Sequence, residues 1–294
     1  MANLKEIRNR IVSVSSTQQI TSAMKMVSAA KLRRAQDAVT QMRPYANKLR
    51  EILENLSASL DSSDGVYSKQ RDVKNVLIIA ITSNRGLCGG FNANIIKASN
   101  KLIRENYQGK NVNVLCIGKK GADYYRKTDY GFKKEEFPNS LNELYDNLVF
   151  SNVAPVAEKI MELYAAGNFD RVDLIYNQFK NAAVQIVTQE QYLPVQPPAV
   201  DENNAKATGE YIFEPNKQYI VEDLIPRSLK TQLFKALLDS LASEHGARMT
   251  AMHKATDNAG SLIKELKLTY NKARQASITN EILEIVGGAE ALNG

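Results

Sequence analysis

Two long stretches, one towards each end of the chain, are almost free of residues that break helices. Residues 3–60 contain no glycine and a single proline, Pro44, and residues 227–286 contain no proline and only Gly246 and Gly260. Helix-favouring residues such as alanine, leucine, lysine and arginine dominate both stretches. At 1.5 Å per residue, stretches of about 60 residues form rods of about 90 Å, far longer than a compact domain needs. The sequence therefore predicts two long helices that pack against each other as an antiparallel coiled coil.

The apolar stripe of the first helix is interrupted. Its 3-4 spacing starts at Leu4, meets polar residues between Gln18 and Ser28, and recovers at Leu32. Within the interruption the apolar residues occupy other positions, namely Ile20, Met24 and Val27. We therefore expect the stripe to slide round the helix at this point. Pro44 is expected to bend the rod without ending it.

The end of the second helix, residues 264–293, has an unusual composition. Its 3.5-residue seam carries mostly small or polar side chains: Leu262, Leu266, Thr269, Ala273, Ala276, Asn280 and Leu283. A packed pair of helices has large apolar residues at most such positions. We expect this helix to end at Gly287 and Gly288. The narrow segment is either a poorly packed terminus or a piece that fits inside another protein.

The middle of the chain alternates strands and helices. Residues 73–81 and 112–117 are predicted strands, residues 93–107 are a helix between them, and residues 171–178 are a third strand. A turn that contains three glycines, residues 82–92, follows the first strand. This strand–helix–strand order implies right-handed crossovers and a parallel sheet.

The remaining segments are shorter. Residues 123–150 are polar and predict an edge strand with its connections, and residues 154–165 predict a helix. Three extended segments surround a polar loop, residues 197–209, which we expect to be mobile. These segments are residues 184–189, 191–195 and 211–213. Pro226 suits the first turn of the last helix.

Together these elements predict an α/β protein. Residues 1–60 and 222–294 form a coiled-coil shaft of long N- and C-terminal helices, and residues 70–221 form an inserted open α/β domain of the Rossmann-like type. The composition, 44% hydrophobic and 24% charged, is typical of a globular protein. The longest apolar run, residues 76–81, is far shorter than the ~20 residues of a membrane-spanning helix. The first residues lack the apolar core of a secretory signal, so we expect no targeting segment.

Positive charge is concentrated near the N-terminus. Residues 1–60 hold ten basic and four acidic residues, a net charge of +6, which equals that of the whole chain. Such a stretch suggests an anionic partner surface. Residues 1–44 contain no Phe, Trp or Tyr, so a stacking platform for nucleic-acid bases is missing. A solvated helix face and an acidic protein partner are therefore favoured, and a nucleic-acid-binding hairpin stays an alternative.

The glycine-containing turn does not match a nucleotide fingerprint. Gly86, Gly89 and Gly90 have the spacing G-x-x-G-G, which differs from the glycine patterns of dinucleotide-binding and P-loop folds. The second strand is followed by Gly118 and Lys119, where a dinucleotide fold has an acidic residue. A tight turn is therefore favoured over a bound nucleotide, and a nucleotide-dependent enzyme stays the weaker alternative.

No other residues suggest catalysis or metal binding. His245 and His253 lie eight residues apart, with no cysteine nearby, so packing at a surface or interface is favoured over metal binding. Cys88 and Cys116 lack metal-ligand spacing and are interpreted as small buried residues. We expect no catalytic residue, no cofactor and no metal.

Four blocks of the sequence resemble the gamma subunits of rotary ATP synthases. They are ITSAMKMVSAAKLRRAQ at residues 20–36, TSNRGLCGGFN at 82–92, RMTAMHKATDN at 248–258, and residues 265–289. The last block contains the family signature as Ile278, Thr279, Glu281, Glu284, Gly288 and Ala289. The blocks occur in the family's order and span nearly the whole chain.

The resemblance implies a central stalk without catalytic activity of its own. In that family the coiled coil stands inside a hexamer of alpha and beta subunits, and the α/β domain sits below it on the membrane c-ring. The epsilon subunit is a further partner that the resemblance implies. Rotation by the ring changes the catalytic sites in sequence, so the implied function is the coupling of proton translocation to ATP synthesis and hydrolysis, and the regulation of that activity. The implied place is the cytoplasmic face of a bacterial inner membrane, peripheral and without membrane insertion or nucleic acid.

The resemblance also implies contact residues. Contacts with the catalytic subunits match seven positions of this chain: Met24, Lys25, Arg248, Arg274, Gln275, Thr279 and Glu281. Contacts with the membrane ring match three: Tyr211, Phe213 and Glu214.

Overall fold

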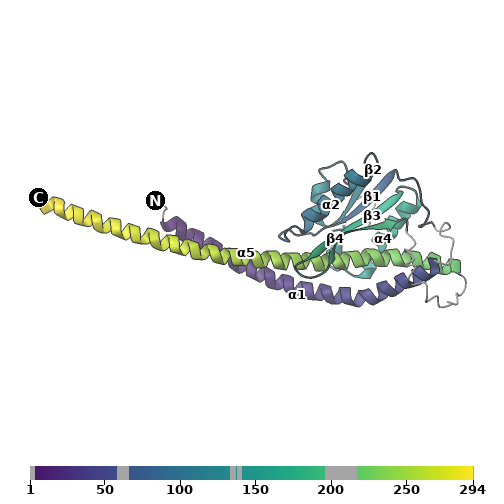
Figure 1. The fold of residues 1–294 in the computed structure, drawn as a ribbon, viewed down its shortest axis with the longest axis horizontal. Helices are drawn as coiled ribbons and strands as arrows, with labels where there is room; N and C mark the ends of the chain where they lie inside the picture. Colours follow the sequence, from purple (N-terminus) through teal and green to yellow (C-terminus); the bar gives the residue numbers. More distant parts are fainter. Residues whose placement is uncertain (1–3, 58–65, 133–136, 138–140, 196–216, 294) are drawn as a thin grey trace. The chain divides into compact units, whose positions relative to one another are not determined.

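The computed structural model describes residues 4–57, 66–132, 137, 141–195 and 217–293. The chain divides into two compact units. The helical-pair unit comprises Met1–Ser28 and Met249–Gly294, and the sheet unit comprises Ala29–Arg248. Two long helices, α1 (Leu4–Ser57) and α5 (Lys217–Asn293), contribute residues to both units (Figure 1).

The two long helices confirm the main prediction, but α5 is longer than expected. Pro44 lies inside α1 and Pro226 lies inside α5, which begins nine residues before that proline. The predicted end at Gly287 and Gly288 is wrong, because α5 continues to Asn293. A glycine ends a helix when it adopts a positive φ, and neither of these two does so. Among the described residues, no helix is long and apolar enough to cross a membrane.

The sheet unit contains a four-stranded sheet of order β2-β1-β3-β4. The strands are β1 (Asn75–Ile81), β2 (Asn111–Ile117), β3 (Arg171–Phe179) and β4 (Gln185–Leu193). β1 is parallel to β2 and to β3, as predicted, and β4 pairs antiparallel with β3. The predicted extended segments 184–189 and 191–195 are one strand, β4, joined to β3 by a hairpin turn.

Helices cover both faces of this sheet. The crossover helices are α2 (Phe91–Asn106) and α4 (Phe150–Ala165). Successive residues of β1 point to opposite faces, so Val76, Ile78 and Ala80 join the core on the α2 side, whereas Leu77, Ile79 and Ile81 join the core on the α4 side. The α4-side core also contains α5 residues: Leu229, Leu233, Ala236 and Leu237. A part of α5 is therefore a core helix of the sheet unit, which extends beyond the predicted domain 70–221.

Residues 123–150 differ from the predicted edge strand. In the described part of this range the chain forms the end of α3 (Lys119–Tyr125) and the short 3-10 helix η2 (Glu143–Tyr145). Among the residues of this range that the structure describes, a single pair extends the sheet, in which Val114 of β2 bridges to Gly131. The backbone N–H of Val114 donates to the carbonyl of Tyr130 over 2.7 Å, and that of Phe132 donates to the carbonyl of Val114 over 3.2 Å.

Candidate functional site

A polar layer joins α1 and α5 within the helical-pair unit, where the two helices run antiparallel (Figure 1). The hydroxyl oxygens of Thr21 and Thr256 are 2.8 Å apart, and Lys25 Nζ lies 3.3 Å from His253 Nδ1. Each threonine hydroxyl also lies within hydrogen-bond distance of a carbonyl of its own helix. These polar side chains thus find partners across the helix pair, and such a layer fixes the register of two packed helices.

The buried positions of α1 continue with the same 3-4 spacing through this polar layer. The prediction that the apolar stripe slides round the helix here is therefore wrong. Thr21 and Ser28 are buried at the seam positions. The apolar residues beside them point outward instead, and their exposed fractions are 60% for Ile20, 66% for Met26 and 58% for Val27. Because the polar seam residues are satisfied inside, the apolar groups are left on the surface of the isolated chain. Ile20 and Val27, seven residues apart, share one face of α1 and are candidates for contact with a partner.

The seam of α5 differs from the predicted one after Leu266. Leu266 is buried and Tyr270 is half-buried, whereas Thr269 and Ala276 are exposed. The buried seam of α5 therefore runs through Tyr270, one residue later than the predicted position at Thr269. Gln18 lies opposite Gly260, since a Cβ at Gly260 would lie 2.9 Å from Gln18 Nε2. Leu4, where α1 begins, precedes Gln18 by 14 residues, so α5 beyond about residue 274 extends past the start of α1.

The last part of α5 presents an apolar face without cover from the described residues. Every residue from 278 to 289 is exposed. Large apolar side chains in this stretch have exposed fractions of 48–71%: Ile278, Ile282, Leu283, Ile285 and Val286. Positions 278, 282, 285 and 286 share one face of a helix. Of the two readings of this segment, the poorly packed terminus and the piece that fits inside another protein, this face favours the second.

The predicted contact residues lie in two places within the helical-pair unit. Arg274, Gln275, Thr279 and Glu281 are exposed near the uncovered end of α5, and Thr279 Oγ1 donates to the carbonyl of Gln275 over 3.0 Å. Met24 and Lys25 are half-buried on α1, where Lys25 belongs to the polar layer. Tyr211, Phe213 and Glu214 lie outside the described residues.

Arg248 belongs to the sheet unit and is bonded inside the chain. Its side chain is nearly buried, and its Nη1 lies 2.7 Å from Glu244 Oε1, one turn earlier on α5. Nη2 donates to the carbonyl of Arg85 over 3.0 Å and to that of Gly86 over 3.3 Å. Sequence reasoning missed Glu244, although the i, i+4 spacing of a carboxylate and an arginine was visible. We call Glu244, Arg248 and these two carbonyls the clamp.

The turn that the clamp holds is braced from within. Asn92 accepts the backbone N–H of Ser83 over 2.9 Å and donates to the Ser83 hydroxyl over 2.8 Å. Leu87 and Gly89 have positive φ values of 62° and 60°. Cys88 and Cys116 are both buried, in agreement with the prediction. Burial raises the pKa of the Cys88 thiol.

This geometry argues against the nucleotide alternative. In doubly wound sheets, ligands bind beyond the carboxyl ends of strands where the strand order reverses, which here is between β1 and β3. α5 lies at those strand ends, because Arg248 contacts the turn after β1 and Gly246 contacts Ala182 in the turn after β3. In the turn after β1, the carbonyl groups of Arg85 and Gly86 point to the Arg248 guanidinium. A phosphate site would need backbone N–H groups there instead. In the described part of the chain, no group of three potential metal ligands is found.

His245 is buried beside the clamp, and this predicts a dependence of stability on pH. Burial and the positive charges of Arg248 and Lys31 lower the pKa of His245 from 6.5 to about 4. Between pH 6.5 and about pH 4, His245 is therefore protonated in the unfolded chain and neutral in the folded chain. The free energy of unfolding consequently falls as the pH is lowered from 6.5 to about 4. Urea unfolding at pH 7.5 and at pH 4.5 measures this loss of stability. We expect the loss to be about 2 kcal/mol smaller in His245→Asn than in the parent chain, because the variant lacks the imidazole. Equal losses would contradict this.

Comparisons with known proteins agree with these features. A family model described as ATP synthase matches residues 3–292. The ATP synthase gamma chain of Flavobacterium johnsoniae is 62% identical over 295 residues and that of Christiangramia forsetii is 60% identical over 295 residues, and both alignments cover 100% of this chain and of the relative.

A solved structure has the same fold. A chain of the Euglena gracilis mitochondrial ATP synthase, from an assembly of OSCP, F1 and c-ring, superimposes with a TM-score of 0.68. The alignment covers 98% of this chain and 94% of that chain, at 22% sequence identity. Because the family model and the relatives both extend over nearly the full length, the chain belongs to the family of ATP synthase gamma chains.

Proposed function

We propose that this chain is the central rotor shaft of a bacterial rotary ATP synthase. It couples rotation of the membrane c-ring to sequential conformational change in a hexamer of alpha and beta subunits, and so to ATP synthesis and hydrolysis, whose activity it also regulates. The observation that carries a shaft function is the end of α5, a helix with an apolar face that no described residue covers. A hexamer that surrounds this segment would bury that face. Family membership supplies the identity of the hexamer.

The exposed residues at this end are suited to contact the catalytic subunits. Arg274 supplies a cation and Glu281 an anion beside the apolar face, and Gln275 and Thr279 supply polar groups between them. On α1, Lys25 and Met24 lie next to the exposed apolar residues that flank the polar layer. Charged groups at the rim of an apolar contact set orientation and partner choice more than affinity.

Arg248 is also proposed to contact the catalytic subunits, which requires a change in its hydrogen bonds within the chain. The residue is 7% exposed and its guanidinium has partners inside the chain, so a contact with the catalytic subunits requires that one of these hydrogen bonds is exchanged. Tyr211, Phe213 and Glu214 are proposed to face the c-ring, and the epsilon subunit is proposed as a second partner of the sheet unit. The chain would be peripheral at the cytoplasmic face of the plasma membrane. The chemistry on ATP belongs to the hexamer, so this chain needs no cofactor.

Reconstitution tests the proposal. Alpha and beta subunits from the same organism are assembled with and without this chain, and steady-state ATP hydrolysis is measured. We expect the chain to be required for fast turnover at saturating ATP, because alternation among the sites depends on an asymmetric shaft. Hydrolysis that is the same with and without the chain would refute the shaft function. A nucleic-acid-binding hairpin would instead bind duplex DNA or RNA with a steep dependence on salt.

A further inference from the structure

The clamp joins α5 to the sheet at the carboxyl end of β1. Arg248 is the centre of this contact, since its guanidinium bonds to Glu244 on the same helix and to the carbonyls of Arg85 and Gly86 in the turn. Arg248 Nε lies a further 3.4 Å from the Gly86 carbonyl. Both charged side chains are nearly buried. A buried ion pair is strongly disfavoured when one partner is removed, because the remaining charge stays unpaired.

A second contact fixes the same side of α5 at the carboxyl end of β3. Gly246 packs on the hairpin turn between β3 and β4, where a Cβ would lie 3.1 Å from the carbonyl oxygen of Ala182 and 3.2 Å from its Cα. The backbone of α5 is therefore close to that turn. Asn181 shapes the turn by accepting the backbone N–H groups of Ala183 and Val184, over 3.0 Å and 2.8 Å. Two turns of the sheet thus meet one short segment of α5.

This segment differs from the part of α5 that precedes it in the sequence. There Leu229, Leu233 and Leu237 enter the apolar core, and apolar contacts have no preferred direction. The polar contacts of that part are a hydrogen bond from the Tyr192 hydroxyl to the Leu229 carbonyl, one from Gln232 to Glu190, and a partly exposed ion pair between Lys230 and Glu158. Hydrogen bonds from a guanidinium do have a preferred direction, since each N–H points along a fixed axis and weakens steeply when misaligned. Adjacent residues of a helix are separated by about 100° around its axis, so a rotation of α5 by one residue would move Arg248 away from both carbonyls. The clamp therefore resists rotation of α5 about its own axis more than the apolar core does.

We propose that the clamp transmits torque between α5 and the sheet, with Glu244 as a positioning residue that holds the Arg248 guanidinium on the turn after β1. This proposal rests on the proposed shaft function. In a rotor, force enters at one part of the chain and leaves at another, so α5 and the sheet must turn together. Without the clamp, α5 would resist rotation against the sheet less, so it would slip more often under load, and more ATP hydrolysis would then occur without proton transport.

The test compares proton pumping with ATP hydrolysis in membrane vesicles that contain the whole complex. Glu244→Leu removes the carboxylate that orients Arg248. We expect protons pumped per ATP hydrolysed to fall at least about fivefold, the lower end of the coupling that two sites of one protein show. Glu244→Gln keeps an acceptor oxygen, so its ratio is expected between that of Glu244→Leu and that of the parent. If Glu244→Leu does not assemble, Glu244→Gln alone decides, and a ratio equal to the parent's overturns the proposal.

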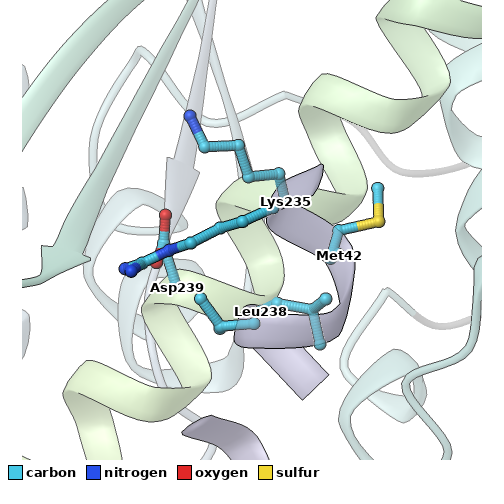
Figure 2. Close-up of a pocket in the computed structure, with 6 residues that line it drawn as sticks. Met42, Lys235, Leu238 and Asp239 are labelled. Carbon is cyan, nitrogen blue, oxygen red and sulfur yellow. The ribbon is translucent and has the colours of Figure 1, made fainter. Parts of the chain in front are cut away.

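Asp239 of α5, which lines a small pocket with Lys235, Leu238 and Met42 (Figure 2), does not serve as a control, because its carboxylate accepts a backbone hydrogen bond from Phe179 at the end of β3. Asp173→Leu is the matched control, since Asp173 is a buried carboxylate on β3 whose side-chain partners, Tyr107 and Arg171, do not belong to α5. We expect this variant to keep the parent's ratio of pumping to hydrolysis, even where less complex assembles. A similar fall in both leucine variants would show a loss of packing and would overturn the proposal. Failure of the shaft function looks different, because the parent complex itself would then not pump.

Discussion

Replacing Ala276 with tryptophan will stop turnover of the assembled complex while the chain itself stays folded. Ala276 is exposed on α5, beyond the start of α1, two residues before Ile278, where the exposed apolar face begins. In the isolated chain the larger side chain meets solvent, so the substitution changes helix stability by less than about 1 kcal/mol. Inside a closely fitting hexamer it meets the wall, and overpacking a tight interface is strongly unfavourable.

A series of side chains of increasing size separates this steric effect from other causes. We expect Ala276→Ser to turn over like the parent, Ala276→Leu to be slowed, and Ala276→Trp to be inactive, all measured as ATP hydrolysis by the reconstituted hexamer. Lys101→Trp is the control, since Lys101 is exposed on α2 and lies in the sheet unit. Far-UV circular dichroism of each free chain checks folding. Unchanged hydrolysis by Ala276→Trp would refute the view that a surrounding protein fits closely here.

The elements that sequence reasoning predicted well are those with strong local signals. The absence of glycine in residues 3–60 is enough to predict α1, and the run of β-branched and other apolar residues in β1 is enough to predict a buried strand. The order of strands and helices then implied the parallel pairs that β1 makes with β2 and β3. These conclusions need only neighbouring residues and general rules of topology.

The seam between Gln18 and Ser28 could not be predicted in this way. Its polar residues look unfavourable in a helix pair until their partners are known, and those partners lie more than 200 residues later in the chain. Thr21 is buried because Thr256 lies opposite, a relation that periodicity alone does not contain. The predicted apolar stripe therefore passed through Ile20, although this residue is exposed in the structure.

The clamp was missed for a related reason. Glu244 and Arg248 have the spacing of an ordinary exposed ion pair on a helix, and the sequence carries no sign that both are buried. Their burial follows from the packing of α5 against the carboxyl ends of β1 and β3, which depends on the whole fold of the sheet unit. The family resemblance likewise implied a partner for Arg248 in another subunit, whereas its partners in this chain are Glu244 and the carbonyls of Arg85 and Gly86.

Replacing Gly118 with alanine will unfold the sheet unit or destabilise it by about 4 kcal/mol or more. Gly118 directly follows β2 and has φ 115° and ψ 139°, a conformation that residues with a side chain rarely adopt. A Cβ there would also lie 2.1 Å from the carbonyl oxygen of Thr82 and 2.8 Å from its hydroxyl oxygen. Thr82 cannot easily retreat, because its backbone N–H donates to the carbonyl of Ile117 and its hydroxyl accepts the N–H of Gly121. The two strand ends are thus held together at the place where the methyl group would enter.

Gly109→Ala separates the two causes of this loss. Gly109 also has a positive φ, 75°, but a Cβ there would have no atom within 4 Å other than those of its chain neighbours. The control therefore carries backbone strain without the clash, and its expected cost is about 1 to 2 kcal/mol. Urea unfolding of the free chain, followed by far-UV circular dichroism, measures both variants. A large loss for Gly118→Ala with a small one for Gly109→Ala assigns the difference to the contact with Thr82. Equal small losses would mean that β1 and β2 can separate at this end without harm, which the hydrogen bonds of Thr82 argue against.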